Sequence, residues 1–124
     1  MKQVPASAMK NAKEAIAAMQ KGEPQTARPL FERAIAEGIR DPAIYLGLAY
    51  ACANLNDSTA TLKAVDQALE LDPLNLRALI FKADHLAQLG KSRKALVFYQ
   101  GALKVAAQGA EITEDIRKGL ARAE

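Results

Sequence analysis

A triplet of small, large and small residues recurs along this chain at a fixed interval. Ala27, Phe31 and Ala34 are spaced by four and then three residues, which places them on one face of a helix. The triplet returns 34 positions later, and again after another 34, as Thr61, Val65 and Ala68 and then as Ala95, Tyr99 and Ala102. Such a period predicts a stacked array of helix pairs, each pair shielding the apolar face of the next.

Helix-breaking residues divide the chain in step with this period. Gly22, Asn56 and Gly90 occupy the turn position within each pair, and Asp41-Pro42 and Asp72-Pro73 separate the pairs. The apolar pattern predicts helices over about 7–21, 24–38, 42–54, 59–71, 76–89, 92–107 and 113–122. No segment alternates as a strand would, so the predicted fold class is all-α.

The period also predicts the domain organisation. Small residues fall at Ala15, Ala49 and Ala83, where the two helices of each pair are expected to cross. We therefore expect a single domain over 1–124, with repeats at about 8–41, 42–75 and 76–109 and a capping helix at about 113–123. Neither a Gly/Ser-rich linker nor a low-complexity stretch interrupts it.

These features resemble the tetratricopeptide repeat, a helix–turn–helix unit of 34 residues. The middle unit carries that family's pattern at Tyr45, Leu48, Ala49, Asn56, Ala68 and Pro73. The third carries it at Leu79, Ala83, Leu86, Gly90, Ala95, Tyr99 and Ala102. The first unit departs from it, because Asn11 and Glu14 stand at positions expected to be apolar, as an exposed terminal repeat allows. The resemblance implies an α-solenoid of three tetratricopeptide-like repeats plus a C-terminal capping helix.

A fainter resemblance concerns the run from Asp66 to Ala106. It is similar to repeat modules that precede aspartyl/asparaginyl β-hydroxylase domains, which depend on iron and 2-oxoglutarate. His85 is the only histidine, so two histidines and a carboxylate cannot be assembled here as iron ligands. If this resemblance holds, the chain is a structural or dimerisation module of a larger oxygenase-like protein.

Composition narrows the functional classes. The chain is 50% hydrophobic, lacks tryptophan and has a net charge of +3, without the dense basic and aromatic stripe of a nucleic-acid binder. Its single cysteine, Cys52, excludes an internal disulfide and a multi-cysteine metal motif. No apolar stretch approaches the ~20 residues that span a bilayer. We expect a cytoplasmic protein that uses no cofactor or metal and contacts neither nucleic acid nor membrane.

The expected function is protein binding. In tetratricopeptide arrays the first helix of each repeat lines a concave groove, so the resemblance implies a peptide or partner helix bound by Ile16, Met19, Leu46, Tyr50, Asn54, Arg77, Ile80 and Asp84. Tyr50 is the expected anchor, because its ring buries a large area. The family also has a carboxylate clamp for chaperone tails, built from lysine, asparagine and arginine. The corresponding positions here are Ala12, Ile16, Tyr50, Arg77 and Phe81. Only Arg77 fits, so that mode is not expected.

Several residues have simpler interpretations. Ile16 and Met19 can instead pack beneath the N-terminal tail, and Cys52 is expected to be a small core residue. Asp84 and His85 are adjacent in sequence, so they point in different directions and are not expected to form a catalytic pair. Lys91, Arg93 and Lys94 are expected to be solvated, with an anionic partner as the alternative. The chain is therefore predicted to be a non-catalytic interaction module, with a homodimer possible.

Overall fold

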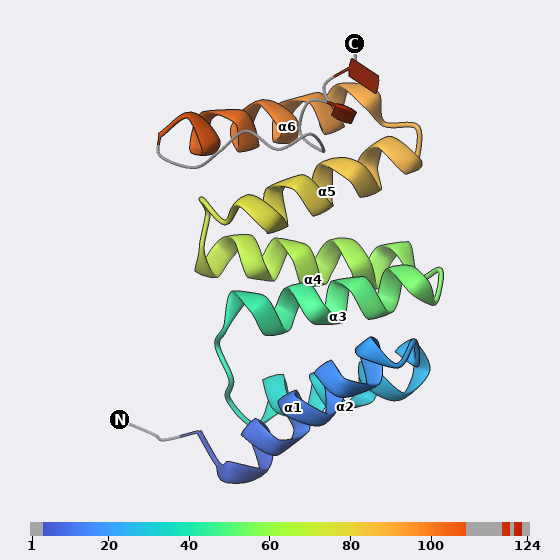
Figure 1. Ribbon diagram of the computed structural model, residues 1–124, viewed down its shortest axis with the longest axis vertical. Helices are drawn as coiled ribbons and strands as arrows, with labels where there is room; N and C mark the ends of the chain where they lie inside the picture. Colours follow the sequence, from blue (N-terminus) through green and yellow to red (C-terminus); the bar gives the residue numbers. More distant parts are fainter. Residues whose placement is uncertain (1–3, 109–117, 120, 123–124) are drawn as a thin grey trace. The chain divides into compact units, whose positions relative to one another are not determined.

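A computed structural model of the chain describes residues 4–108, 118–119 and 121–122, and six complete helices make up most of this part (Figure 1). They are α1 (Ala6–Gln20), α2 (Pro24–Ala36), α3 (Pro42–Asn54), α4 (Ser58–Leu71), α5 (Leu76–Gln88) and α6 (Ser92–Ala107). No strand occurs among the described residues, which confirms the all-α prediction. Most of the expected capping helix lies outside the described residues, although 118–119 and 121–122 are helical.

The chain divides into two compact units, Met1–Asp72 and Pro73–Glu124. The first holds α1 to α4 and thus two helix pairs, and the second holds α5, α6 and the described C-terminal residues. The division falls beside the expected boundary between the second and third repeats. Whether the units act as the single domain predicted from sequence stays a prediction.

Each helix pair turns at the residue that the sequence pattern places there. Gly22 and Gly90 have φ angles of 75° and 79°, and Asn56 has a φ of 60°. This left-handed conformation favours glycine, and asparagine tolerates it better than most residues do. The position therefore ends α1, α3 and α5 in the same way.

Polar side chains begin the helices in the middle of the chain. Asp41 accepts a hydrogen bond from the Ala43 backbone N–H, and Asp57 and Asn75 cap α4 and α5 in the same manner. These caps satisfy backbone donors that a helix leaves free at its first turn. The repeat boundaries are thus marked by local hydrogen bonds as well as by packing.

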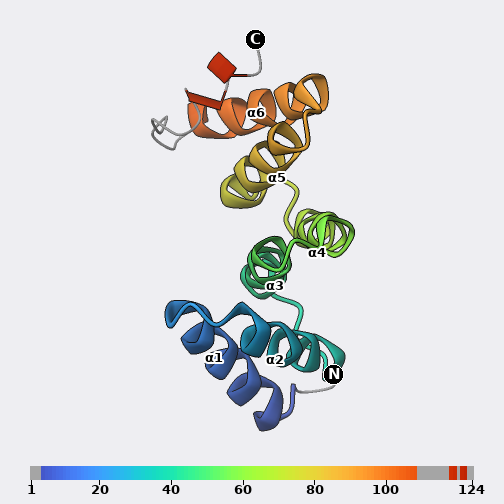
Figure 2. The ribbon, with the colours of Figure 1, turned by 90° about the vertical axis from the view of Figure 1, so that its right-hand side faces the viewer.

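In the first unit α1 packs on α2, α2 on α3, and α3 on α4 (Figure 2). Alanines fill the crossing between α1 and α2, since Ala8, Ala15, Ala27 and Ala34 are fully buried. Phe31 supplies the largest fully buried side chain in this unit, at 1% exposure. Small residues therefore let the helices approach closely, and one ring fills the remaining space.

Hydrogen bonds between α1 and the end of α2 explain the polar residue at position 11 of the first repeat. The Glu37 carboxylate, just beyond the end of α2, accepts hydrogen bonds from the Ser7 hydroxyl and from the Asn11 amide, the latter at 3.2 Å. Asn11 therefore makes a polar contact at a position where other repeats have an apolar residue. Glu14, the other departure, is exposed and pairs with Lys10 at 3.9 Å.

In the second unit α5 and α6 form a hairpin with an aromatic centre. Leu79, Ala83 and Leu86 are buried on α5, and Ala95, Tyr99 and Ala102 are buried on α6. Tyr99 is fully buried, and Gly119 lies directly against its ring. A Cβ atom at residue 119 would stand 2.2 Å from the ring, so only glycine fits there. The described C-terminal residues therefore pack on α6 through that ring.

Candidate partner-binding surface

An apolar pocket opens between α1 and α3 in the first unit. Its volume is about 300 Å³, and its lining residues are Ile16, Met19, Gln20, Phe31, Gly47 and Tyr50. The α1 residues are spaced by three and four along the helix, and Gly47 and Tyr50 are spaced by three along α3. Each helix therefore presents one face to the pocket.

Two side chains at this pocket are much more exposed than apolar residues in a core. Ile16 is 44% exposed and Tyr50 is 46% exposed, whereas Phe31 beneath them is 1% exposed. Two exposed apolar side chains beside a hollow are typical of a surface that a partner covers.

Gly47 determines how the aromatic ring sits below the pocket. A Cβ atom at residue 47 would come within 2.6 Å of the Phe31 ring, a distance that real side chains do not tolerate. Glycine within a helix costs about 1 kcal/mol relative to alanine. Its presence here is explained by this close approach, which brings the Phe31 ring up to the backbone of α3.

The structure distributes the first unit's expected binding residues over three environments. Ile16, Met19 and Tyr50 line the pocket together. Leu46 is only 6% exposed, so it leaves little surface for a partner. Asn54, the last residue of α3, is exposed and is not among the residues that line the pocket.

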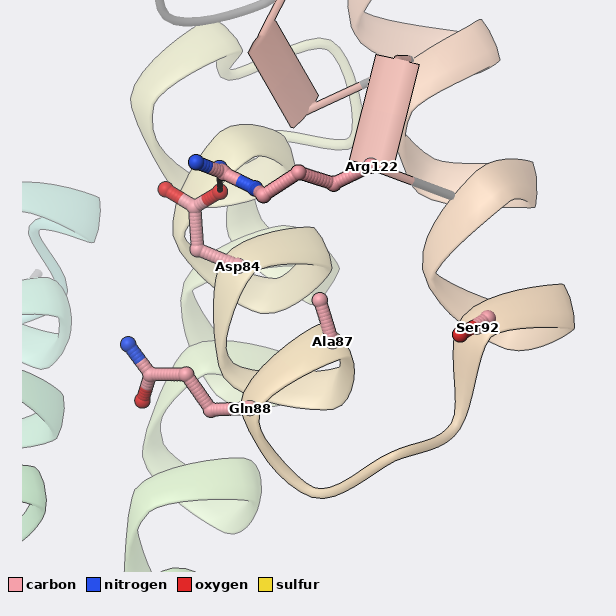
Figure 3. A pocket seen from close by; sticks show the side chains of 5 residues that line it. All are labelled: Asp84, Ala87, Gln88, Ser92 and Arg122. Carbon is pink, nitrogen blue, oxygen red and sulfur yellow. Dashed lines mark hydrogen bonds and ion pairs between the residues drawn. The ribbon is translucent and has the colours of Figure 1, made fainter. Parts of the chain in front are cut away.

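The second unit has a larger and more polar pocket, of about 630 Å³ (Figure 3). Asp84, Ala87 and Gln88 contribute from α5, Ser92 contributes from the start of α6, and Arg122 contributes from the C-terminal residues. Asp84 is the only expected binding residue of this unit that lines it. Arg77 is exposed and Ile80 is half-buried on α5, and both lie outside the pocket lining.

Asp84 is engaged within the protein. Its carboxylate accepts a hydrogen bond from the Tyr99 hydroxyl and pairs with the Arg122 guanidinium at 3.5 Å. Burial raises the pKa of Tyr99, and the hydrogen bond to Asp84 raises it further. Both effects favour the protonated phenol, so Tyr99 remains the donor in this contact.

Cys52 and His85, two side chains that carry chemistry in many proteins, are both buried. Cys52 is 1% exposed as expected, and burial raises the pKa of its thiol, which disfavours the reactive thiolate. His85 is buried and stacks on Phe81, with the ring centroids 6.3 Å apart, and burial lowers its pKa. The part of the chain that is described holds no cluster of three potential metal ligands. None of its helices is long and apolar enough to cross a membrane.

Sequence reasoning missed some of the residues that form the two pockets. Gln20, Phe31 and Gly47 line the first, and Ala87, Ser92 and Arg122 line the second, but none was among the expected binding residues. Gly47 alone left a signal, because a glycine inside a strongly helical segment usually has a packing reason.

A family comparison decides what kind of protein carries these pockets. The tetratricopeptide-repeat family model matches residues 12–60 and 54–111, which together cover most of the chain. The chain belongs to the tetratricopeptide-repeat family. The resemblance stated from the sequence is thereby confirmed, and so is the helical-repeat solenoid as its fold class.

Solved structures share this tetratricopeptide-repeat fold at low sequence identity. The TPR2B domain of yeast Sti1, solved in a complex with pHsp70, is 21% identical with a TM-score of 0.88, over 96% of this chain and 97% of that chain. The Yersinia enterocolitica type III secretion chaperone SycD, in complex with a peptide of the translocator YopD, is 17% identical with a TM-score of 0.88, over 98% and 96%.

The second TPR domain of human RPAP3, in complex with an HSP70 peptide, is 18% identical with a TM-score of 0.83, over 94% of each chain. A search of curated proteins gives no match to this tetratricopeptide-repeat chain.

Proposed function

We propose that this tetratricopeptide-repeat chain is a non-catalytic interaction module that binds a peptide or partner helix on the pocket-bearing face of α1 and α3. The observation that carries the proposal is the pair of exposed apolar side chains, Ile16 and Tyr50, beside a hollow of about 300 Å³. Covering these side chains removes apolar surface from water, which contributes about 25 cal/mol per Å². The pocket would hold one apolar side chain of the bound segment.

Complexes formed by similar structures support binding rather than catalysis. Yeast Sti1, human RPAP3 and Yersinia SycD are each described with a protein or peptide partner. The mode of recognition is expected to differ from the family's carboxylate clamp, because Ala12, Ile16 and Tyr50 replace charged or amide groups there. Recognition through apolar packing fits these residues better.

The proposal is tested by placing a charge in the pocket. Tyr50→Arg puts a cation where an apolar side chain would bind, and we expect loss of captured partners by at least about tenfold. Leu71→Arg is the matched control, because Leu71 is 42% exposed and does not line the pocket. Affinity capture with quantitative mass spectrometry compares the variants, and circular dichroism verifies that both remain folded.

Unchanged capture by a folded Tyr50→Arg variant would contradict the proposed function. The alternative, a dimerisation module of a larger oxygenase-like protein, stays a prediction. Sedimentation at several protein concentrations tests its dimer, since a strict monomer at high concentration removes it.

A further inference from the structure

We infer that α6 carries a second docking surface, which takes an acidic segment of another protein. Its residues, called here the outer face of α6, are Arg93, Lys94, Val97, Gly101 and Lys104. The bound segment would pass close to the backbone of Gly101 and pair its carboxylates with the cations at the two ends of the face. This inference goes beyond the proposed function and does not rest on the pocket between α1 and α3.

Helix geometry places these five residues on one side of α6. They follow one another at intervals of three and four residues, which is the spacing of a single helix face. The residues that α6 buries, Ala95, Tyr99, Ala102 and Ala106, share the opposite side. Four of the five outer residues are exposed, and Gly101 is half-buried. The packing of α6 therefore leaves this face open to a partner.

The described structure gives no packing reason for the glycine at position 101. Gly101 lies inside a helix, where glycine is less stable than alanine, and its φ angle is not positive. No described residue lies within 4 Å of a Cβ atom placed there, whereas Gly47 and Gly119 each lie against a buried ring. A glycine also lets the backbone of another segment approach closely. On an open face, Gly101 therefore indicates the close approach of a partner.

The apolar part of this face distinguishes α6 from the corresponding helix of the preceding pair. Val97 is 63% exposed and lies one turn before Gly101. The positions 34 residues earlier, on α4, hold Lys63 and Gln67, whose long polar side chains suit contact with water. Val97 and the bare backbone of Gly101 instead form an apolar strip. Covering this strip with a partner removes apolar surface from water.

Cations border the strip at both ends. Arg93 and Lys94 precede it and Lys104 follows it, over about 16 Å of helix. None of these three has an ion-pair partner among the described residues. Residues 85–110 contain no aspartate or glutamate, whereas α2 and α4 each carry at least one acid. The outer face of α6 therefore complements the charge of an acidic partner.

The same face favours a polypeptide over other anionic partners. Nucleic-acid bases stack on aromatic side chains, and the outer face has none. The nearby Phe98 is half-buried, with the Lys82 ammonium 4.4 Å from the centre of its ring. A membrane surface needs a broad apolar face, whereas Val97 is the only large apolar side chain of α6 that is exposed. An acidic protein segment needs only one apolar contact and a close approach to the helix.

The experiment begins with a selection that reports this face. A phage-displayed library of random peptides is depleted on the full chain with Gly101→Leu and then selected on the full wild-type chain. Each peptide is fused through its C-terminus, so no terminal carboxylate is free. We expect enriched peptides with several aspartates or glutamates and few basic residues. Enriched peptides that are basic or uncharged would overturn the inference, and so would the absence of any enriched peptide.

A single methyl group then tests the close approach, with one enriched synthetic peptide whose C-terminus is amidated. Gly101→Ala is expected to weaken binding about fivefold, because the added group overpacks the contact. The same change should raise the thermal stability of the free chain, since alanine favours the helix. Gln67→Ala, at the corresponding position of α4, is the matched control and should change binding less than about twofold. Equal binding by wild type and Gly101→Ala would overturn the close approach.

Charge reversal tests the cations with the same peptide. Lys104→Glu is expected to weaken binding about fivefold, as the loss of an exposed ion pair and its replacement by a like charge would do. Lys63→Glu makes the same change of net charge on α4, and we expect it to weaken binding less than about twofold. Equal effects of these two variants would refute a contact between the peptide and Lys104.

Two further outcomes separate this inference from its alternatives. If Tyr50→Arg abolished binding of the peptide and Gly101→Ala did not change it, the peptide would occupy the pocket between α1 and α3. The inference would then fail while the proposed function stood. Binding of poly-uridylate RNA or phosphatidylserine vesicles that Lys104→Glu abolishes, without any enriched acidic peptide, would overturn the choice of a protein partner.

Discussion

Each unit buries an aromatic ring from the second helix of a pair, Phe31 in the first and Tyr99 in the second. The two rings pack alike but differ in their polar contacts. In the first, Phe31 lies against Gly47 of α3, and in the second, Tyr99 lies against Gly119. A glycine in the following helical segment makes room for the ring in both. The described C-terminal residues therefore contact a ring of α6 through a glycine, as α3 contacts a ring of α2.

The two buried rings differ by one hydroxyl group. The Phe31 ring can make no hydrogen bond, and the surface above it is apolar, with Ile16 and Tyr50 exposed. The Tyr99 hydroxyl donates to Asp84. Asp84 also pairs with Arg122, and the pocket beside them is polar (Figure 3). The buried phenol of Tyr99 thus belongs to an internal polar network, whereas the Phe31 ring lies beneath an apolar pocket.

Removing the ring from the first unit should have the largest effect. Phe31→Ala leaves a cavity beneath α3 and is expected to lower the free energy of unfolding by about 3–5 kcal/mol. Urea denaturation followed by circular dichroism measures this change. A loss below about 1 kcal/mol would show that α2 and α3 collapse into the space and that the ring does not organise the pocket.

Replacing Gly47, which lies against the Phe31 ring, should have the next largest effect on stability. Gly47→Ala forces a Cβ atom to within 2.6 Å of a ring that is 1% exposed and has little room to move. We expect a net loss of about 1–2 kcal/mol, since overpacking outweighs the gain in helix propensity. Gly101→Ala is the matched control, because nothing lies within 4 Å of a Cβ atom there. It should gain about 0.5–1 kcal/mol.

Equal effects of the two glycine substitutions would refute the close approach as the reason for Gly47. A double mutant adds a second check. In Phe31→Leu/Gly47→Ala the smaller side chain at residue 31 relieves the collision. The double mutant should therefore lose less stability than the sum of the losses in the two single mutants.

The buried rings were predictable from sequence, but their surroundings were not. The repeated triplet predicted that Phe31 and Tyr99 would face the core, and they are 1% and 0% exposed. A glycine inside a helical segment indicates a packing reason, but the sequence does not tell that the Phe31 ring is what approaches Gly47. Its role depends on a ring 16 positions earlier that another helix brings close.

Whether the expected binding residues contact a partner stays a prediction, but their exposure could not be predicted for a related reason. Helix phase gives the direction of a side chain but does not tell which neighbours cover it. Ile16 and Tyr50 are 44% and 46% exposed and line the pocket, whereas Leu46, assigned to the same face, is 6% exposed. Asp84 has the expected phase too, but its contacts with Tyr99 and Arg122 join residues distant in sequence.

Replacing Tyr99 with phenylalanine, the residue type of the first unit's ring, is expected to have a smaller effect on stability. Tyr99→Phe removes the hydrogen bond to Asp84 and is expected to cost about 1–2 kcal/mol. The pKa of Tyr99 is raised in the folded protein, so the protonated phenol stabilises the fold below its ordinary pKa of about 10. This stability is lost as the pH rises through the folded pKa.

Denaturation of wild type and Tyr99→Phe at pH 7 and in alkali separates the two contributions. The loss above pH ~10 should be smaller in Tyr99→Phe, which cannot ionise at this position. Cys52 remains in both proteins, and its raised pKa acts in the same direction, so the difference between them reports Tyr99 alone. An identical alkaline loss in both would contradict the phenol–carboxylate contact.

The smallest effect on stability is expected from the ion pair between Arg122 and Asp84. Arg122 and Asp84 are 3.5 Å apart, with side chains 61% and 38% exposed, so water screens their attraction. Arg122→Gln should lower stability by less than about 0.5 kcal/mol, and added salt should erase the difference. A loss as large as that of Tyr99→Phe would show instead that Arg122 holds the carboxylate in place. Measuring Arg122→Gln in the Tyr99→Phe background decides between these two interpretations. If the ion pair is independent of the Tyr99 hydrogen bond, Arg122→Gln lowers the free energy of unfolding equally in both backgrounds.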